Sequence, residues 1–335
     1  MSFIEVENQR QSEFKYSSPY FSDRARADGV YLQPGRVVPC SYCLPLPCAE
    51  ENLFPEIRAA AVAYFQELDI WWHDAGTRPS NHMRDSQVCC VNFLFPLAQH
   101  PDALAELLRP IFPALRRVLP IEASQFVAFE RIGLENYLNN AIELPRQRGK
   151  GCTSSDAAVL FENERARREI ALLNWKYTET YSGKPLHVSQ HDRDRVSMYR
   201  PFYQKPDCPL DKGLIANFED LFYDPFDQLM RLQFLGREME RARELEAERV
   251  TLVNIVPAAN AEALWVSSPN LRSLGATAPE VWKGLVSPPD RFAHVSTEKL
   301  FGALALDRFS ELRPWWTYLT ARHLWLVPAR EAPAP

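Results

Sequence analysis

Residues 154–181 have the sequence SSDAAVLFENERARREIALLNWKYTETY, and this stretch decides the fold. Its apolar runs are separated by a charged segment, 162–168. Short apolar runs joined by a polar turn are typical of buried neighbouring strands. We therefore predict one strand over 156–161, a hairpin turn over 162–168 and a second strand over 169–181.

The segments on either side complete an α/β pattern. Upstream, 125–131 is predicted to be a strand, and apolar periodicity predicts helices over 53–72, 86–97 and 102–118, the last split by Pro113. Downstream, Asp224-Pro225 is a helix start, with aspartate as the N-cap and proline in the first turn. This helix is expected to run to about 248, before a buried strand over 249–256.

The predicted order is helix, three strands, helix, strand, which implies a mixed central sheet flanked by helices. We assign residues 51–260 to this domain. Residues 1–50 are polar and interrupted by prolines, and we expect them to form an N-terminal arm. Residues 261–335 are rich in aromatic residues and proline, and we expect a C-terminal extension packed on the same domain.

Three side chains at the ends of the paired strands suggest chemistry. Alternation along a strand places Asn174 and Lys176 on one face, and Asp156 on the neighbouring strand can lie across from them. A carboxylate beside a lysine amine is a suitable site for a divalent cation and an attacking water. Asn174 occupies the position where a second acid would complete this arrangement.

Three motifs in this order resemble the PD-(D/E)XK nuclease superfamily. They are SSDAAVLF at 154–161, NWKYTETY at 174–181 and YDPFDQLMR at 223–231. More narrowly, the chain resembles a bacterial family of restriction endonuclease-like proteins. The resemblance covers roughly residues 80–260 and implies a restriction-endonuclease-like core, αβββαβ.

The resemblance also implies a function. It makes Asp156 a ligand of Mg²⁺ or Mn²⁺, Lys176 the residue that orients or deprotonates water, and Gln228 a helix residue near the scissile phosphate. Glu130 resembles an additional upstream acid of the metal site. The expected activity is hydrolysis of DNA phosphodiester bonds, in restriction or defence against foreign DNA.

Asn174 departs from the motif, which has Glu or Asp at this position. An amide oxygen can bind a hard cation but contributes no charge, so affinity should fall. Either Glu130 supplies the missing carboxylate, or the site is weak or inactive. The alternative function is therefore a nuclease-fold module that binds DNA without cutting it.

Basic residues on both sides of the motif could contact the phosphates of DNA, although scattered surface charge is the ordinary alternative for each. Cleavage of both strands usually takes two active sites, which favours a homodimer. The candidate DNA-binding residues are Arg146, Arg148, Lys150, Lys184, Arg193 and Arg195.

Composition limits the class of protein. A net charge of −5 excludes a uniformly basic protein that coats nucleic acid, but a local basic groove remains compatible with it. We see no signal peptide and no membrane-length apolar run, and we expect a cytoplasmic protein. Cys40, Cys43 and Cys48 could bind zinc, with Cys89 and Cys90 further on. We favour buried reduced thiols, because no second CxxC pair follows.

Overall fold

The computed structural model describes residues 1–33, 36–73, 76–138, 146–187 and 194–327. Its centre is a six-stranded sheet in the order β3-β5-β6-β7-β8, with β4 also paired to β5. Strands β3, β4 and β6 run antiparallel to β5, whereas β6, β7 and β8 are mutually parallel. The strands are β3 (Leu115–Leu119), β4 (Ala128–Arg131), β5 (Ser155–Asn163), β6 (Arg168–Trp175), β7 (Ala247–Val256) and β8 (Phe292–Ser296). The predicted mixed α/β fold is confirmed.

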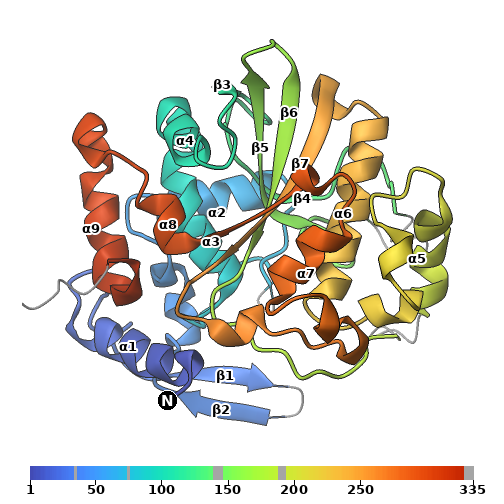
Figure 1. Cartoon of the computed structure of the whole chain (residues 1–335). Coiled ribbons are helices and arrows are strands. Elements are labelled where there is room, and N and C mark those ends of the chain that lie inside the picture. The colour runs from blue at the N-terminus through green and yellow to red at the C-terminus, as the bar shows by residue number, and fades with distance from the viewer. Residues whose placement is uncertain (34–35, 74–75, 139–145, 188–193, 328–335) are drawn as a thin grey trace, which may run out of the picture.

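Helices cover both faces of the sheet, with separate apolar cores (Figure 1). One core is formed with α2 (Arg58–Glu67), α3 (Ser86–Leu94), α4 (Pro101–Leu108), α8 (Thr297–Phe301) and α9 (Arg313–Arg322). The other contains α5 (Arg195–Gln204), α6 (Phe226–Arg241) and α7 (Ala278–Leu285). Coverage on both sides explains why the β5, β6 and β7 sequences are nearly continuous apolar runs. No helix in the described part of the chain is long and apolar enough to cross a membrane.

The first 50 residues form α1 (Phe3–Ser17) and the antiparallel pair β1 (Gly29–Gln33) and β2 (Arg36–Cys40), at the lower edge of Figure 1. Ser2 and Glu5 form a capping box that fixes the start of α1. Helix α1 contacts α9, and its Phe14 belongs to the same apolar core as α3. The first and last α-helices therefore meet on one face of the sheet.

Helix α6 lies against β7 on the opposite face. Its single glycine, Gly236, allows this close packing, because a Cβ atom there would lie 3.1 Å from Cγ1 of Val250. The predicted start of α6 was misplaced by one residue. Pro225 is the N-cap, no side chain caps the helix, and Asp224 stands outside it. The helix ends at Arg241 rather than near 248, and left-handed residues at Arg243 and Leu245 turn the chain into β7.

Two other predicted elements were wrong in part. The helix expected over 102–118 ends at Leu108, since Pro110 and Pro113 follow, and residues from Leu115 form β3 against β5. The strand expected over 169–181 ends at Trp175. Strand β8 was not predicted, and it extends the sheet from within the region expected to be a C-terminal extension.

Candidate functional site

Asp156 lies at the start of β5, beside the end of β6. The β5–β6 register pairs Ala157 with Leu173, and one further step along the same register leads to Asp156 and Asn174. The backbone N–H of Trp175 donates to Oδ2 of Asp156 over 2.6 Å. The sheet therefore brings together the two strand ends on which the candidate site was predicted.

The surroundings of Asp156 disfavour the ionised form of its carboxyl. Burial raises the pKa of its carboxyl to about 6, and the nearby Glu130 carboxylate acts in the same direction, although Lys176 opposes both. A carboxylate that is difficult to ionise without a cation is a common feature of functional sites.

Lys176 follows β6 immediately. Its backbone N–H donates to the carbonyl of Ile255 over 2.9 Å, so the residue continues the sheet although the strand has ended. The residue is only 7% exposed. Its charge influences both Asp156 and Asp224, yet within the described part of the chain its amine makes no hydrogen bond or ion pair. An amine close enough to influence two acids, but paired with neither of them, is available to a ligand.

Asn174 is fully buried and belongs to a row of polar side chains across three strands. Its Nδ2 donates to Oδ1 of Asn254 over 2.7 Å, and the Asn254 amide contacts Nδ1 of His294 at 3.3 Å. These three residues are register partners on β6, β7 and β8. Oδ1 of Asn174 has no partner among the described residues. The amide therefore has a structural role that a carboxylate could not perform without rearrangement, and it keeps one oxygen free.

Glu130 is the second carboxylate near Asp156, and it is 1% exposed. Its Oε1 accepts from Gln87 over 2.8 Å and lies 3.2 Å from Nε2 of His73, while Oε2 accepts from Ser154 over 2.5 Å. Burial alone raises the pKa of Glu130, but the charge of His73 and these hydrogen bonds outweigh it and hold the pKa below its usual value. Glu130 would have to give up one of these contacts to bind a metal directly.

His73 is a site residue that the sequence did not reveal. Burial lowers the pKa of its imidazole, but the Glu130 carboxylate more than compensates and raises the pKa to about 9. The sequence separation between His73 and Glu130 contains no motif, so no local signal could have identified this pair. His82 lies elsewhere, between the rings of Tyr31 and Tyr42.

The beginning of α6 approaches the site from the other side. Arg231 donates to Oδ2 of Asp227 over 3.0 Å and to the hydroxyl of Thr153 over 3.3 Å, which links the helix to the segment entering β5. Gln228, next to Asp227, is half-buried. Burial and the charge of Asp227 raise the pKa of Asp224, and Lys176 opposes them. Gln228 thus lies in the first turn of the helix that begins just after Asp224.

A buried network fixes the chain just beyond Lys176. The hydroxyl of Tyr177 donates to Glu7 of α1 and accepts from Nε2 of Gln11 over 3.0 Å. Gln11 in turn accepts from Nε of Arg322 on α9 over 3.0 Å. The first and last helices therefore hold the strand end on which Lys176 is mounted.

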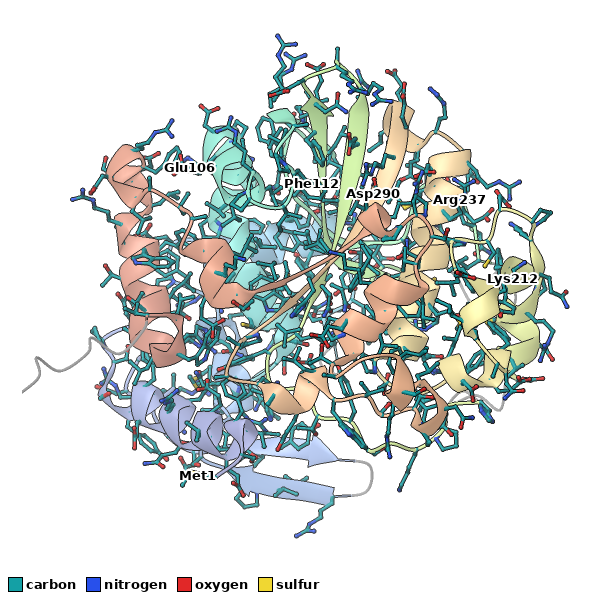
Figure 2. All side chains as sticks on the ribbon, in the orientation of Figure 1. Met1, Glu106, Phe112, Lys212, Arg237 and Asp290 are labelled. Carbon is teal, nitrogen blue, oxygen red and sulfur yellow. The ribbon has the colours of Figure 1, made fainter. Side chains whose placement is uncertain are left out.

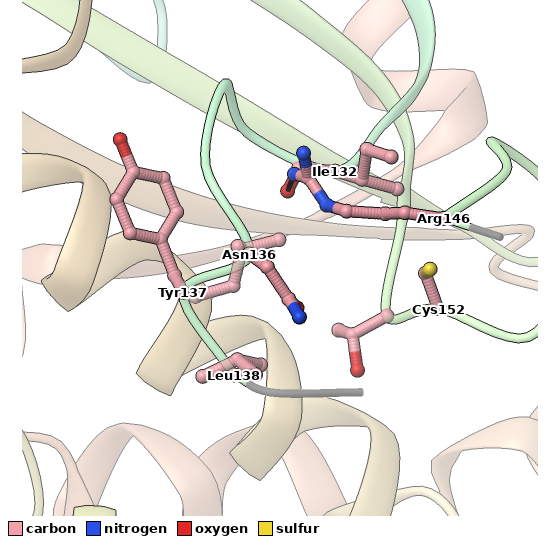
Figure 3. Close-up of a pocket in the computed structure, with 8 residues that line it drawn as sticks. Ile132, Asn136, Tyr137, Leu138, Arg146 and Cys152 are labelled. Carbon is pink, nitrogen blue, oxygen red and sulfur yellow. Dashed lines mark hydrogen bonds between the residues drawn. The ribbon is translucent and has the colours of Figure 1, made fainter. Parts of the chain in front are cut away.

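Two of the predicted DNA-binding arginines have internal partners. Arg146 donates to the carbonyls of Ile132, Gly133 and Leu134, and it lines a pocket of about 10 Å³ (Figure 3). This volume holds one water at most. Arg148 donates to Glu122 over 2.8 Å. Both side chains hold the loop that leads to Asp156.

The same loop requires a glycine. Gly149 has φ +75°, and a Cβ atom there would lie 2.3 Å from the carbonyl oxygen of Trp71. Lys150 is exposed with its amine 3.8 Å from the centre of the Trp71 ring, and Lys184 is also exposed. Arg195 binds Asp227 over 2.9 Å. Arg193 lies outside the described residues. Among these, Lys150 and Lys184 are the best placed to contact DNA phosphates, which stays a prediction.

The cysteines are distributed between different parts of the fold. Cys40, Cys43, Cys48, Cys89 and Cys90 are all buried, and the structure contains no disulfide among the described residues. In that same part of the chain, no three side chains of His, Cys, Asp or Glu are grouped so that they could hold a metal ion. Any cation at Asp156 would therefore need amide, carbonyl, water or substrate oxygens as further ligands.

Comparison with known families gives one match. The model of the family described as "Restriction Endonuclease associating with ARP" matches residues 10–324. No curated protein and no solved structure matches the chain.

Proposed function

The chain belongs to the family of restriction endonucleases associating with ARP, and from this premise we propose that it is a Mg²⁺-dependent endonuclease that hydrolyses DNA phosphodiester bonds. The family supports a nuclease-like role. The metal, the substrate and the site residues are our proposal from the arrangement around Asp156 and Lys176.

The observation that carries the proposal is the arrangement at the end of the sheet where β5 begins and β6 ends. Asp156 is fixed by the backbone of Trp175, and the next residue, Lys176, presents an amine without a partner among the described residues. A buried lysine is destabilising unless its charge is used, so its place beside a carboxylate with a raised pKa supports a catalytic role.

The residues present fit a small hard cation. Oδ2 of Asp156 is held by a backbone N–H, and Oδ1 of Asn174 is a buried oxygen without a partner in the described structure. Mg²⁺ is commonly bound through one or two carboxylates together with waters and substrate phosphate oxygens. Asp156 and Asn174 would hold it, and Glu130 would join them only after losing its contact with Ser154 or His73.

Once bound, the cation would polarise the phosphate and lower the pKa of a coordinated water. Lys176 would hold the attacking water in line with the phosphorus atom. The water oxygen would bond to phosphorus as the bond to the leaving oxygen of the sugar breaks, and the proton that the water loses would pass to that leaving oxygen through solvent. Gln228 on α6 and the exposed Lys150 and Lys184 would position the DNA backbone.

A second candidate function is DNA binding without cleavage. It is favoured by one observation, the hydrogen bond from Asn174 to Asn254, because this amide is built into the sheet where an acid would strengthen metal binding. In this case the protein would bind DNA with an affinity that depends on salt but not on Mg²⁺.

The test is cleavage of supercoiled plasmid with Mg²⁺ or Mn²⁺ by the native protein, Lys176→Ala and Asn174→Asp. The Asp substitution adds the missing charge with almost no change in size. Lys212→Ala is the matched control, because this lysine is exposed and its amine contacts the Lys205 carbonyl, away from the proposed centre.

Cleavage by the native protein and by Lys212→Ala that is lost in Lys176→Ala would support the endonuclease. Cleavage only by Asn174→Asp would favour the binding function for the native protein, because a carboxylate at position 174 would then be what the metal site lacks. If none of the four proteins cuts plasmid and none binds it in a salt-dependent manner, both proposed functions are wrong.

A further inference from the structure

A cavity of about 490 Å³ lies at the β8 edge of the sheet, away from the candidate catalytic site. It is lined by the α4–β3 connection, the start of β7, and β8 with its flanking helices. Figure 2 labels Phe112 and Asp290, which line it from two different elements. Its volume lies within the roughly 300–1,000 Å³ typical of small-molecule sites. Strands are about 4.8 Å apart, so β8 is about 14 Å from β5, which carries Asp156.

The charges that line this cavity are mainly positive. Arg249, Lys283 and Lys299 face it, with Asp290 as their counterpart. Nη2 of Arg249 lies 2.9 Å from Oδ2 of Asp290, so that pair is neutral. The amines of Lys283 and Lys299 have no ion pair within the described residues. Two cations without acids, on different helices and facing one cavity, favour an anionic ligand.

The wall of the cavity also contains a buried polar group without a partner. Thr251 on β7 is 2% exposed, lines the cavity, and its hydroxyl makes no hydrogen bond to the described part of the protein. Nε of Arg249 also makes no hydrogen bond in the described structure, but it lies 3.9 Å from Oε2 of Glu169. Buried polar atoms almost always have a partner, so the Thr251 hydroxyl needs an explanation. A ligand in the cavity would supply its hydrogen-bond partner.

Part of the cavity lining is apolar. Phe112 and Ile111 line it from the α4–β3 connection, and Ala293 lines it from β8. An aromatic ring can pack on such a surface while its polar edge reaches toward the strand. The cavity therefore combines a surface for a flat ring with two free amines for a phosphate.

We propose that this cavity is a second ligand site, which binds a nucleoside phosphate. The base would pack against Phe112, the phosphate would lie between Lys283 and Lys299, and Thr251 would hydrogen-bond to the ligand. None of the residues proposed to hold the cation, the attacking water or the DNA lines this cavity, although His294, which contacts Asn254 in the row that begins at Asn174, does. The nucleotide is either free or part of a nucleic acid strand, and the same chemistry recognises both.

The proposal is tested by calorimetric titration of the full chain with ATP, GTP, CTP and UTP, with the matching nucleosides and with inorganic phosphate. We expect at least one nucleotide to bind more tightly than its nucleoside. The double variant Lys283→Gln/Lys299→Gln should weaken that binding by about tenfold or more, the loss expected for one charged hydrogen bond. Thr251→Val, which keeps the shape of the side chain, should weaken it by a smaller factor.

Lys212→Gln is the matched control, since Lys212 is exposed, does not line the cavity and its amine contacts the Lys205 carbonyl (Figure 2). The melting temperature of each variant shows whether it is folded. Lys283 and Lys299 are exposed, so the double variant still tests the proposal if Thr251→Val does not fold. A single-stranded oligonucleotide that displaces the nucleotide identifies the source as a strand, and lack of displacement identifies a free nucleotide. Absence of nucleotide binding, or binding that the double variant does not weaken, overturns the proposal.

Discussion

The ion pair between His73 and Glu130 should make the stability of this protein depend on pH in a defined window. Nε2 of His73 lies 3.2 Å from Oε1 of Glu130, and the side chains are 35% and 1% exposed. Burial lowers the pKa of His73, but Glu130 raises it to about 9, above the ordinary value of 6.5. Below pH 6.5 the imidazole is protonated in both the folded and the unfolded chain, so its stabilising contribution is fully present. It is lost as the pH rises toward 9, because only the folded chain keeps the proton.

The magnitude follows from the same values. A rise in pKa from 6.5 to about 9 corresponds to about 3 kcal/mol at face value. Because about a third of the His73 side chain is exposed, solvent screening reduces this figure, and we expect about 1–2 kcal/mol. The thiol of Cys40 acts in the opposite direction, since its hydrogen bond with Cys43 lowers its pKa to about 7 and adds stability as the pH rises. Comparison with a variant is therefore essential.

The assay is urea unfolding of the native protein and His73→Gln at pH 6.5 and pH 9. Glutamine can still donate to Glu130 but does not titrate, so its stability should change less between the two pH values. His100→Gln is the matched control, because His100 also lies near an acid, Glu311, but at the surface. If native protein and His73→Gln lose the same free energy of unfolding between pH 6.5 and 9, the ion pair has no such role and the reasoning is refuted.

Three further changes have expected outcomes. Asp156→Asn should abolish cleavage yet raise the free energy of unfolding at pH 7.5 by about 1–2 kcal/mol, because burial raises the pKa of this carboxyl to about 6 and its charged form opposes folding above that pH. Thermal melts should also show that Mg²⁺ stabilises the native protein but not this variant, and equal stabilisation of both would contradict the assignment of Asp156. Arg322→Met should lower the free energy of unfolding in guanidinium by about 3 kcal/mol or more. The reason is that Arg322 is 2% exposed and donates to Gln11, Asn52, Met83 and Tyr318. A loss below about 1 kcal/mol would count against this network. Gly149→Ala should lower the free energy of unfolding by about 2 kcal/mol, measured by differential scanning calorimetry. An alanine there would need a left-handed backbone, and its Cβ atom would lie 2.3 Å from the Trp71 carbonyl oxygen. Gly284→Ala is the control, because the space around Gly284 is open.

Part of the fold could be predicted because its signals are local. β5, β6 and β7 are mostly apolar with few polar residues, which indicates strands buried on both faces, and the structure has all three strands at nearly the predicted starting positions. Errors occurred where a tertiary partner decides the outcome. Residues 115–119 have no strong strand pattern of their own and form β3 because β5 offers an open edge. The chain leaves the sheet after Lys176, where Glu179 accepts the backbone N–H of Tyr177 over 2.5 Å.

Local patterns were enough to predict the α/β class, the order of its central elements and Asp156, Asn174 and Lys176 as candidates, because strand periodicity and motif spacing are properties of neighbouring residues. The surroundings of these three residues, in contrast, depend on contacts that form only in the folded protein. His73 forms an ion pair with Glu130, and Asn174 donates a hydrogen bond to Asn254. The residue after Lys176 belongs to a buried network that includes Glu7 and Arg322. These contacts join residues far apart along the chain, and their energies depend on burial and distance, which exist only after the two layers of helices have closed over the sheet.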